Sequence, residues 1–254
     1  MSVVSSDLKW YGSANMQESD SGTQGGAIDT SIVVVPADST LFNTLNTTLE
    51  VLSANAGDTT QTVTVYGRSA AGTIVSEVFN LNGTTVQNGA TTFERILKIV
   101  VSASHAGTIT IRKASDDTTI AQLLTGELQI RRCFYNVSAD VSGGSSRDYY
   151  EKIFAKNTNG SNALLGAQIQ ENADPESQVT FAVEDAVNDN GTSTNRVTAP
   201  AGITGDGFSS SAKNIPGTDL AAGSVIGVWL KLSLPAGDPA TKTTYTPRIT
   251  GSTT

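Results

Sequence analysis

The chain has 254 residues, of which 38% are hydrophobic and 16% are charged, and its formal net charge is −8. This charge is too dilute for a disordered polyelectrolyte, and the acidic balance argues against a protein that works by neutralising phosphates. The adjacent Arg131 and Arg132 would point to opposite faces of a strand, so no direct nucleic-acid partner is expected.

Residues 8–16, LKWYGSANM, are the densest run of large side chains in a chain rich in Thr, Ser, Gly, Ala and Asn. A Gly- and Ser-rich stretch follows them. Aromatic side chains bury much area at modest entropic cost, so Trp10, Tyr11 and Met16 would suit an arm that docks in a neighbour's groove. We predict an extended N-terminal arm over residues 1–36. The alternative is that this run is the first strand of the chain's own domain.

Alternating apolar and polar residues predict a first β-domain over residues 37–126. Its turns contain the Gly and Asn that hairpins need, and its expected strands are TQTVTVYGRS, GTIVSEVFNLNG, RILKIVVSAS and GTITIRKA. RILKIVVSAS is apolar enough to be covered on both faces. The segment 39–52 is predicted as either helix or strand, because its leucines have helical spacing but lie among β-branched threonines. The regular spacing of the expected strands along the sequence indicates a sandwich or barrel.

A second all-β domain, Ig-like or jelly-roll-like, is predicted over residues 127–254. Its expected strands are ELQIRRCFYNVSAD, DYYEKIFAKN, ALLGAQIQEN, SQVTFAVEDA, SVIGVWLKLSL and TYTPRITG. Residues 187–223 form a long tract without clear periodicity, and connections of that length are usually functional surfaces or segments ordered by a partner. Phe208 and Ile215 are therefore candidate partner contacts. Alternatively, these apolar residues anchor the tract on its own domain.

Residues able to carry catalysis are sparse. His105, the single histidine, lies in a predicted turn and is expected to be exposed, and one histidine with one cysteine cannot build a zinc site of the usual kind. Glu184, Asp185 and Asp189 lack the spacing of a calcium loop, so we interpret them as a solvated strand end. Trp229 is expected in a core. We predict no enzymatic activity, no cofactor and no metal, although a carboxylate pair for glycoside cleavage stays open because such pairs assemble only in the fold.

Cysteine usage and apolar runs indicate the compartment. The single cysteine, Cys133, cannot form a disulfide within the chain. The start MSVVSSDLKW lacks the basic and apolar regions of a signal peptide, and no run of about 18 apolar residues predicts a membrane span. We therefore expect a protein that folds in a reducing cytoplasm without disulfide bonds and without a membrane partner.

Several segments taken together resemble structural proteins encoded in tailed-bacteriophage genomes. They are LKWYGSANM with SDSGTQGGAID, VTVYGRSAAGTIVSEVFNLNGTT, FERILKIVVSASHAGTITIR, EKIFAKNTNGSNALLGAQIQENADP and the Thr-rich C-terminal part. The resemblance covers nearly the whole chain and implies a capsid, neck or tail component, with no catalytic residues to carry over. It implies binding to the major capsid protein or other virion proteins, a homo-oligomer, and location in a virion assembled in the host cytoplasm.

Our leading hypothesis is a non-enzymatic head-decorating (cement) protein that stabilises the capsid by binding alone. A Thr-, Ser-, Gly- and Ala-rich protein suits tight symmetric packing, because ordering long charged side chains costs much rotamer entropy. The alternatives are a neck, tail or baseplate component, a virion-displayed receptor- or glycan-binding module, and a virion-associated hydrolase. A glycan module would show exposed aromatic platforms at loop tips, where this chain has little beyond Phe208.

Overall fold

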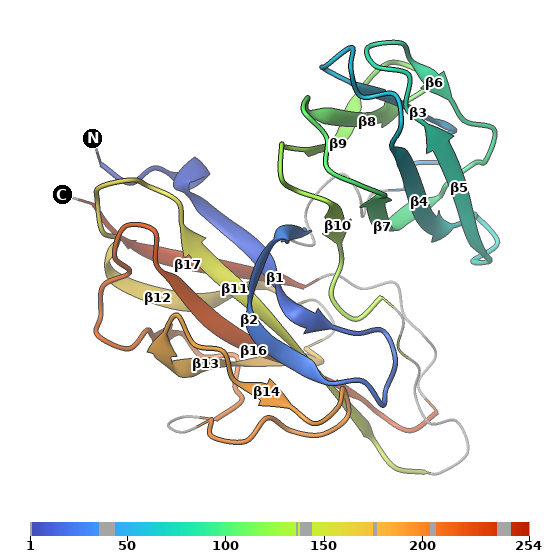
Figure 1. Ribbon diagram of the computed structural model, residues 1–254. Helices are drawn as coiled ribbons and strands as arrows, with labels where there is room; N and C mark the ends of the chain where they lie inside the picture. The colour runs from blue at the N-terminus through green and yellow to red at the C-terminus, as the bar shows by residue number, and fades with distance from the viewer. Residues whose placement is uncertain are drawn as a thin grey trace. The chain divides into compact units, whose positions relative to one another are not determined.

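The computed structural model describes residues 2–35, 44–135, 137, 144–174, 177–203, 207–237 and 245–253. In these ranges the regular elements are strands apart from the short 3-10 helix η1 (Ser5–Asp7), so the predicted all-β fold is confirmed. No helix in the described ranges is long and apolar enough to cross a membrane. The chain divides into two compact units: the first is Met1–Asp29 with Cys133–Thr254, and the second is Thr30–Arg132 (Figure 1).

This division differs from the predicted one, in which an arm over 1–36 precedes domains at 37–126 and 127–254. The predicted arm contains β1 (Leu8–Met16) and β2 (Gln24–Val34), and β1 lies in a sheet of the first unit. The boundary between the two units falls inside β2. The structure therefore has the alternative arrangement, in which the aromatic N-terminal run is a strand of its own domain.

Backbone pairing explains why the N-terminal run belongs to the sheet. β1 is antiparallel to β11 (Arg147–Asn157), with Trp10 opposite Ala155 and Tyr11 opposite Phe154. β16 (Val225–Leu234) pairs with the other edge of β11. Because buried N–H and C=O groups must find partners, the central strand β11 needs a neighbour on both sides, and β1 supplies one of them.

The described residues of the first unit form two sheets. In the larger one the strand order is β13-β16-β11-β1-β2, with β14 paired to β2, and in the smaller one it is β15-β12-β17. The bounds are β12 (Leu165–Ala173), β13 (Val179–Val187), β14 (Thr192–Ser193), β15 (Lys213–Asn214), β16 (Val225–Leu234) and β17 (Thr246–Ser252). Lys213 of β15 lies with Nζ 5.7 Å from the centre of the Phe181 ring of β13, so the small sheet meets the large one at this point.

The central strands β11 and β16 are covered on both faces, which accounts for their long apolar runs. Residues 149–155 of β11 and residues 225–230 of β16 are all buried. Trp229 is 1% exposed, which confirms it as a core residue. Two charged residues, Glu151 and Lys152, are buried inside the same run of β11.

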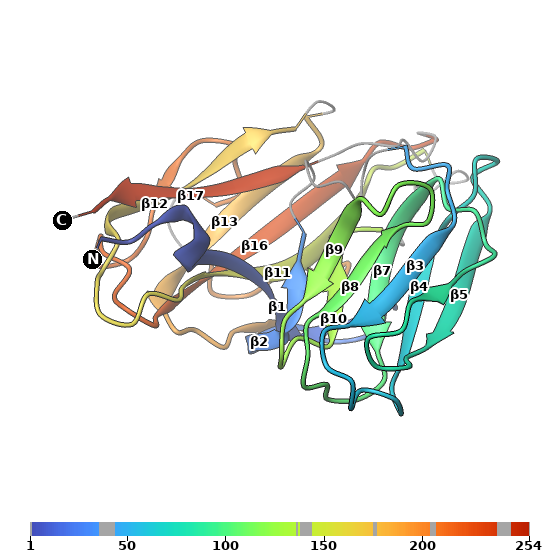
Figure 2. The same ribbon diagram turned by 90° about the horizontal axis from the view of Figure 1, so that it is seen from above.

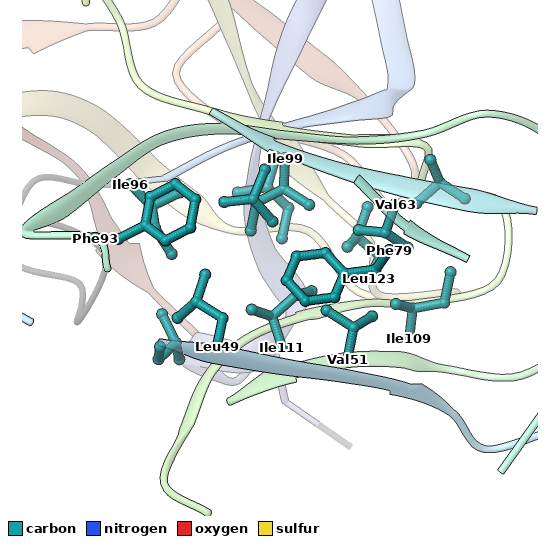
Figure 3. Packing of buried hydrophobic residues seen from close by; sticks show 14 of the residues in the cluster. Leu49, Val51, Val63, Phe79, Phe93, Ile96, Ile99, Ile109, Ile111 and Leu123 are labelled. Atoms are coloured by element: carbon teal, nitrogen blue, oxygen red, sulfur yellow. The ribbon is translucent and has the colours of Figure 1, made fainter. Parts of the chain in front are cut away.

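The second unit is a sandwich of two sheets (Figure 2). One sheet has the order β6-β3-β8-β9; the other has β10-β7-β4-β5, and the last residues of β2 run parallel to β10. The bounds are β3 (Leu49–Ser53), β4 (Thr62–Arg68), β5 (Ile74–Asn80), β6 (Gln87–Asn88), β7 (Arg95–Val101), β8 (Ile109–Lys113), β9 (Thr119–Leu123) and β10 (Gln129–Arg131). Apolar side chains from both sheets meet in one core, which includes Leu49, Val51, Val63, Phe79, Ile99, Ile109, Ile111 and Leu123 (Figure 3).

The sequence pattern predicts most of this sandwich correctly. β4 alternates as expected, with Val63 buried and Tyr66 exposed. β7 is not covered on both faces along its length, because Lys98 is only partly buried. The segment 39–52 ends in a strand, β3, and its first residues lie outside the described part. The strand expected at the start of the second domain is reduced to the three residues of β10, which belong to the second unit.

The tract 187–223 packs on its own unit in its described part, as the alternative interpretation expects. β14 pairs with β2, and Ser209 forms a bridge with Phe181 at the edge of the large sheet. Leu220 is fully buried and forms a bridge with Leu164. Apolar side chains and backbone pairing within the unit therefore order this connection.

Candidate functional site

The five residues predicted as partner contacts lie mostly inside the first unit. Tyr11 and Met16 are buried in β1, Ile215 is 2% exposed, and Trp10 is half-buried. The Phe208 ring packs edge-to-face on Tyr150, with ring centroids 5.5 Å apart. The structure does not gather these side chains into one exposed surface, because strand pairing and the local core already use them.

His105 is buried rather than exposed, which corrects the prediction from its turn sequence. Its Nδ1 lies 2.7 Å from the Gly107 carbonyl oxygen, and its Nε2 lies 2.8 Å from the Glu127 carbonyl oxygen. The ring thus fastens two turns of the second unit to each other.

Asp58 is the second buried polar residue at this junction. Its carboxylate accepts hydrogen bonds from Ser53 Oγ at 2.5 Å and from the backbone N–H groups of Ala106 and Gly107 at 2.9 Å each. Burial favours the protonated form, but these hydrogen bonds and the nearby His105 outweigh it and lower the pKa of Asp58. These hydrogen bonds hold the turn that contains Asp58 against the turn at Ala106 and Gly107, so we interpret Asp58 as a structural residue.

A buried ion cluster lies on one face of β11 in the first unit. We call it the Lys152 cluster, made of Lys152, Glu184, Asp189 and Trp229. Lys152 Nζ is 2.8 Å from Glu184 Oε1, contacts Asp189 Oδ1 directly, and donates to the Gly191 carbonyl at 3.1 Å. Trp229 Nε1 donates to Glu184 Oε1 at 2.6 Å. The side chain of Lys152 is 0% exposed, while those of Glu184 and Asp189 are 9% and 21% exposed, so the amine is shielded from water and the Asp189 carboxyl is partly accessible.

Strand register brings the members of the Lys152 cluster together. Lys152 in β11 lies directly opposite Trp229 in β16, and Trp229 lies opposite Ala182 in β13. Glu184 follows Ala182 by two positions and therefore shares its face. A Cβ on Gly227 would lie 2.8 Å from Lys152 Cε, so a glycine is needed for the long side chain to pass.

The two carboxyls of the Lys152 cluster differ in acidity. Burial raises the pKa of the Glu184 carboxyl, and its hydrogen bond with Asp189 adds to this, while Lys152 and Trp229 oppose it. Burial also acts to raise the pKa of Asp189, but hydrogen bonds from Lys152, the Gly191 N–H and Glu184 lower it overall. Glu184 is therefore the carboxyl that more readily keeps a proton, and the ion pair is that of Lys152 with Asp189.

The opposite face of β11 holds a second buried ion pair. Arg196 donates from an Nη to Glu151 Oε1 at 2.6 Å, and both side chains are 0% exposed. The Arg196 carbonyl also accepts a hydrogen bond from the Tyr150 N–H at 2.7 Å. The segment from Asp189 to Arg196 is thus tied to β11 by charges on both faces.

Neither ion pair is predicted from the sequence. Glu184 and Asp189 are expected at a solvated strand end, whereas in the structure the Glu184 side chain is only 9% exposed and lies beside a lysine. The available signal was the pair Glu151-Lys152 inside the apolar strand sequence YYEKIFA. Charged residues are almost never fully buried unless they are paired, so two of them inside a core strand indicate buried partners.

The second unit exposes an apolar patch that we call the outer face, made of Tyr66, Ile74 and Val78. Their exposed fractions are 36%, 64% and 57%. They lie on one side of the β4–β5 hairpin, where Arg68 is opposite Ile74, and β5 is the last strand of its sheet. Lys98 Nζ lies 4.8 Å from the centre of the Tyr66 ring. The patch therefore has a basic rim in a chain whose net charge is −8.

Within the described residues, no group of three or more His, Cys, Asp or Glu side chains could hold a metal ion. Comparison of the chain with family models, with curated protein sequences and with solved structures gave no match.

Proposed function

We propose that the chain is a non-enzymatic structural component of a tailed-phage virion, a head-decorating (cement) protein that stabilises the capsid through protein–protein contacts. The segments that resemble phage structural proteins suggest the setting, and the outer face of the second unit is the observation that carries the mode of action. Its partners would be the major capsid protein and further copies of this chain.

The outer face has the properties of a binding surface. Tyr66, Ile74 and Val78 expose apolar area on a regular two-stranded surface, so a partner can cover them together. β5 ends its sheet, and an edge strand can accept further backbone pairing. Arg68 and Lys98 beside the patch favour a partner surface with acidic groups.

The first unit does not present the predicted docking arm in its described residues. Its N-terminal aromatic run is paired to β11, and the tract 187–223 is packed on its own unit in the described part. Binding through preformed strands avoids the entropic cost of ordering a flexible arm. We therefore assign the contact with the capsid to the outer face and no longer to Trp10 and Tyr11.

The proposal is tested by sedimentation of the purified chain with phage capsid shells that lack decoration. The variant I74S/V78S removes the exposed apolar groups, and each such side chain contributes about 1.5–3 kcal/mol when fully buried. We expect the variant to bind about a hundredfold more weakly than the native chain. L124S is the matched control, because Leu124 is also exposed, at 42%, but lies after β9 in the other sheet of the sandwich.

Three outcomes separate the proposal from its alternatives. Loss of binding in I74S/V78S with retention in L124S supports the cement role. Failure of the native chain to bind shells, together with binding to purified neck or tail assemblies, moves it to the alternative virion position. Failure to bind any virion component overturns the structural role.

A further inference from the structure

We propose that the first unit is a self-cross-linking domain, in which the side chains of Lys152 and Asp189 join in an intramolecular amide (isopeptide) bond with Glu184 as the proton carrier. This modification site is independent of the proposed virion role. It would give the chain a covalent link that does not depend on its single cysteine or on redox conditions.

The positions of the reacting groups carry this inference. Lys152 Nζ contacts Asp189 Oδ1, and the amine is held by the Gly191 carbonyl on one side and by Glu184 on the other. Groups held in contact react as if present at very high concentration, since their translational freedom is already lost. The geometry therefore places the amine in contact with the Asp189 carboxyl group with no rearrangement of the strands.

The surroundings of the amine exclude water. Lys152 is fully buried, and its Nζ lies 5.1 Å from the centre of the Phe154 ring and 5.7 Å from that of Trp229. Loss of hydration is unfavourable for two separate ions, so it lowers the cost of converting them into a neutral amide and water. The same exclusion of water opposes hydrolysis of the product.

The reaction balances without an oxidant or a co-reactant. The lysine nitrogen forms a bond to Asp189 Cγ, the bond from Cγ to one carboxyl oxygen breaks, and that oxygen leaves as water. Of the three protons on the ammonium group, two leave in the water molecule and one stays on the amide nitrogen. The ion pair of Lys152 and Asp189 thus becomes one amide and one water molecule.

Each neighbour has a role in this step. Glu184 hydrogen-bonds to Asp189 and touches the amine, so it can deliver its proton to the departing oxygen and take one back from nitrogen. Trp229 Nε1 holds the Glu184 carboxyl in place. The Gly191 N–H donates to Asp189 Oδ1 at 2.9 Å and would stabilise negative charge on that oxygen in the tetrahedral intermediate.

A second lysine–aspartate pair in the same sheet provides a comparison. Lys231 of β16 lies 2.9 Å from Asp148 of β11, but the two side chains are 27% and 34% exposed. Water can solvate these ions, and the acid–amine reaction is unfavourable where both groups stay charged and hydrated. We expect an ordinary ion pair at Lys231 and an amide at Lys152.

Peptide mapping of the purified full-length chain, denatured and digested with trypsin, tests the proposal. Acylated Lys152 is not cleaved, so residues 148–156 should remain one peptide, and this peptide should be joined to residues 157–196 with the loss of one water. Tandem fragmentation then locates the link between Lys152 and Asp189. Intact mass alone is not sufficient, because an Asp-Gly sequence such as 206–207 can also lose water by forming a succinimide.

Three variants show whether loss of the link comes from removal of a reacting group or from a general change in folding. K152M and E184Q should both lack the linked peptide, and E184Q should instead show normal cleavage after Lys152. K231M is the control and should retain the link in full. Normal cleavage after Lys152 in the native chain overturns the proposal, and complete linkage in E184Q overturns the role of Glu184.

Discussion

Glu151 and Lys152 are neighbours in β11, yet their charged side chains lie on opposite faces of one sheet and both are 0% exposed. Each is matched by residues from the same connection, Arg196 for Glu151 and Asp189 for Lys152. Two adjacent residues of a core strand therefore hold one irregular segment from both sides. Burial of charge is costly unless every partner is in place, so removal of one partner should destabilise the fold strongly.

The Glu151–Arg196 pair should be sensitive to the loss of one partner. R196M leaves the Glu151 carboxylate buried without its guanidinium, so we expect unfolding free energy to fall by about 3–5 kcal/mol in urea titrations. R147M is the control, since Arg147 and Asp20 form a pair whose side chains are 37% and 40% exposed, and exposed pairs contribute about 0–1 kcal/mol. Equal effects of the two substitutions would contradict the assigned role of the buried pair.

Gly227 should not tolerate a side chain. In G227A the new Cβ would lie 2.8 Å from both Lys152 Cε and Glu184 Cγ, so the Lys152 cluster must shift. Overpacking of this kind costs about 1–3 kcal/mol, measurable as a lower midpoint of thermal unfolding. G160A is the matched control, because a Cβ at Gly160 meets nothing within 4 Å, and its midpoint should be unchanged or slightly raised.

Asp58 predicts a pH dependence of stability in the second unit. Its folded-state pKa lies below the ordinary value of 3.8, so its charged form stabilises the fold above that value, and this contribution is lost as pH falls through the folded-state pKa. D58N should cost about 1–3 kcal/mol near neutral pH, because buried donors lose a charged acceptor. The difference between native chain and D58N should shrink in acid; a difference that grows as pH falls would contradict the assignment.

Substitution of Tyr11 distinguishes a residue of a core strand from an anchor that docks on a partner. The ring is 7% exposed and β1 is paired with β11, so Y11A should lower the unfolding free energy by about 3–5 kcal/mol, as for other buried aromatic residues. Y66A should change it by less than about 1 kcal/mol, because Tyr66 lies exposed on the outer face. A destabilised Y66A with an unaffected Y11A would restore the docking-arm interpretation.

Local sequence patterns predict the strands of this chain well and their long-range partners poorly. The alternation in TVTVYGR correctly places Val63 inside, since side chains of a strand alternate by rule. By contrast, the pairing of Trp10 with Ala155 joins residues far apart in sequence, and no local signal identifies that partner. The aromatic run therefore had the composition of either an anchor or a core strand.

The polar sites show the same limit. Burial of His105 is possible because the carbonyl oxygen of Glu127, 22 residues later in the chain, provides a hydrogen-bond partner for its ring. The Lys152 cluster combines residues from β11, β13, β16 and the connection after β13, so the sequence of no single one of these segments predicts the cluster. The buried Glu151-Lys152 pair was the one local clue, and its meaning depends on partners that only the fold supplies.

We propose that this chain binds a virion through preformed surfaces, and the mass of its complex with capsid shells tests this most directly. Light scattering should show the purified chain adding to undecorated shells until a fixed number of copies per shell is reached, with no further gain at higher concentration. The I74S/V78S variant should add little mass under the same conditions. Shells whose mass does not change in the presence of the native chain would contradict the account.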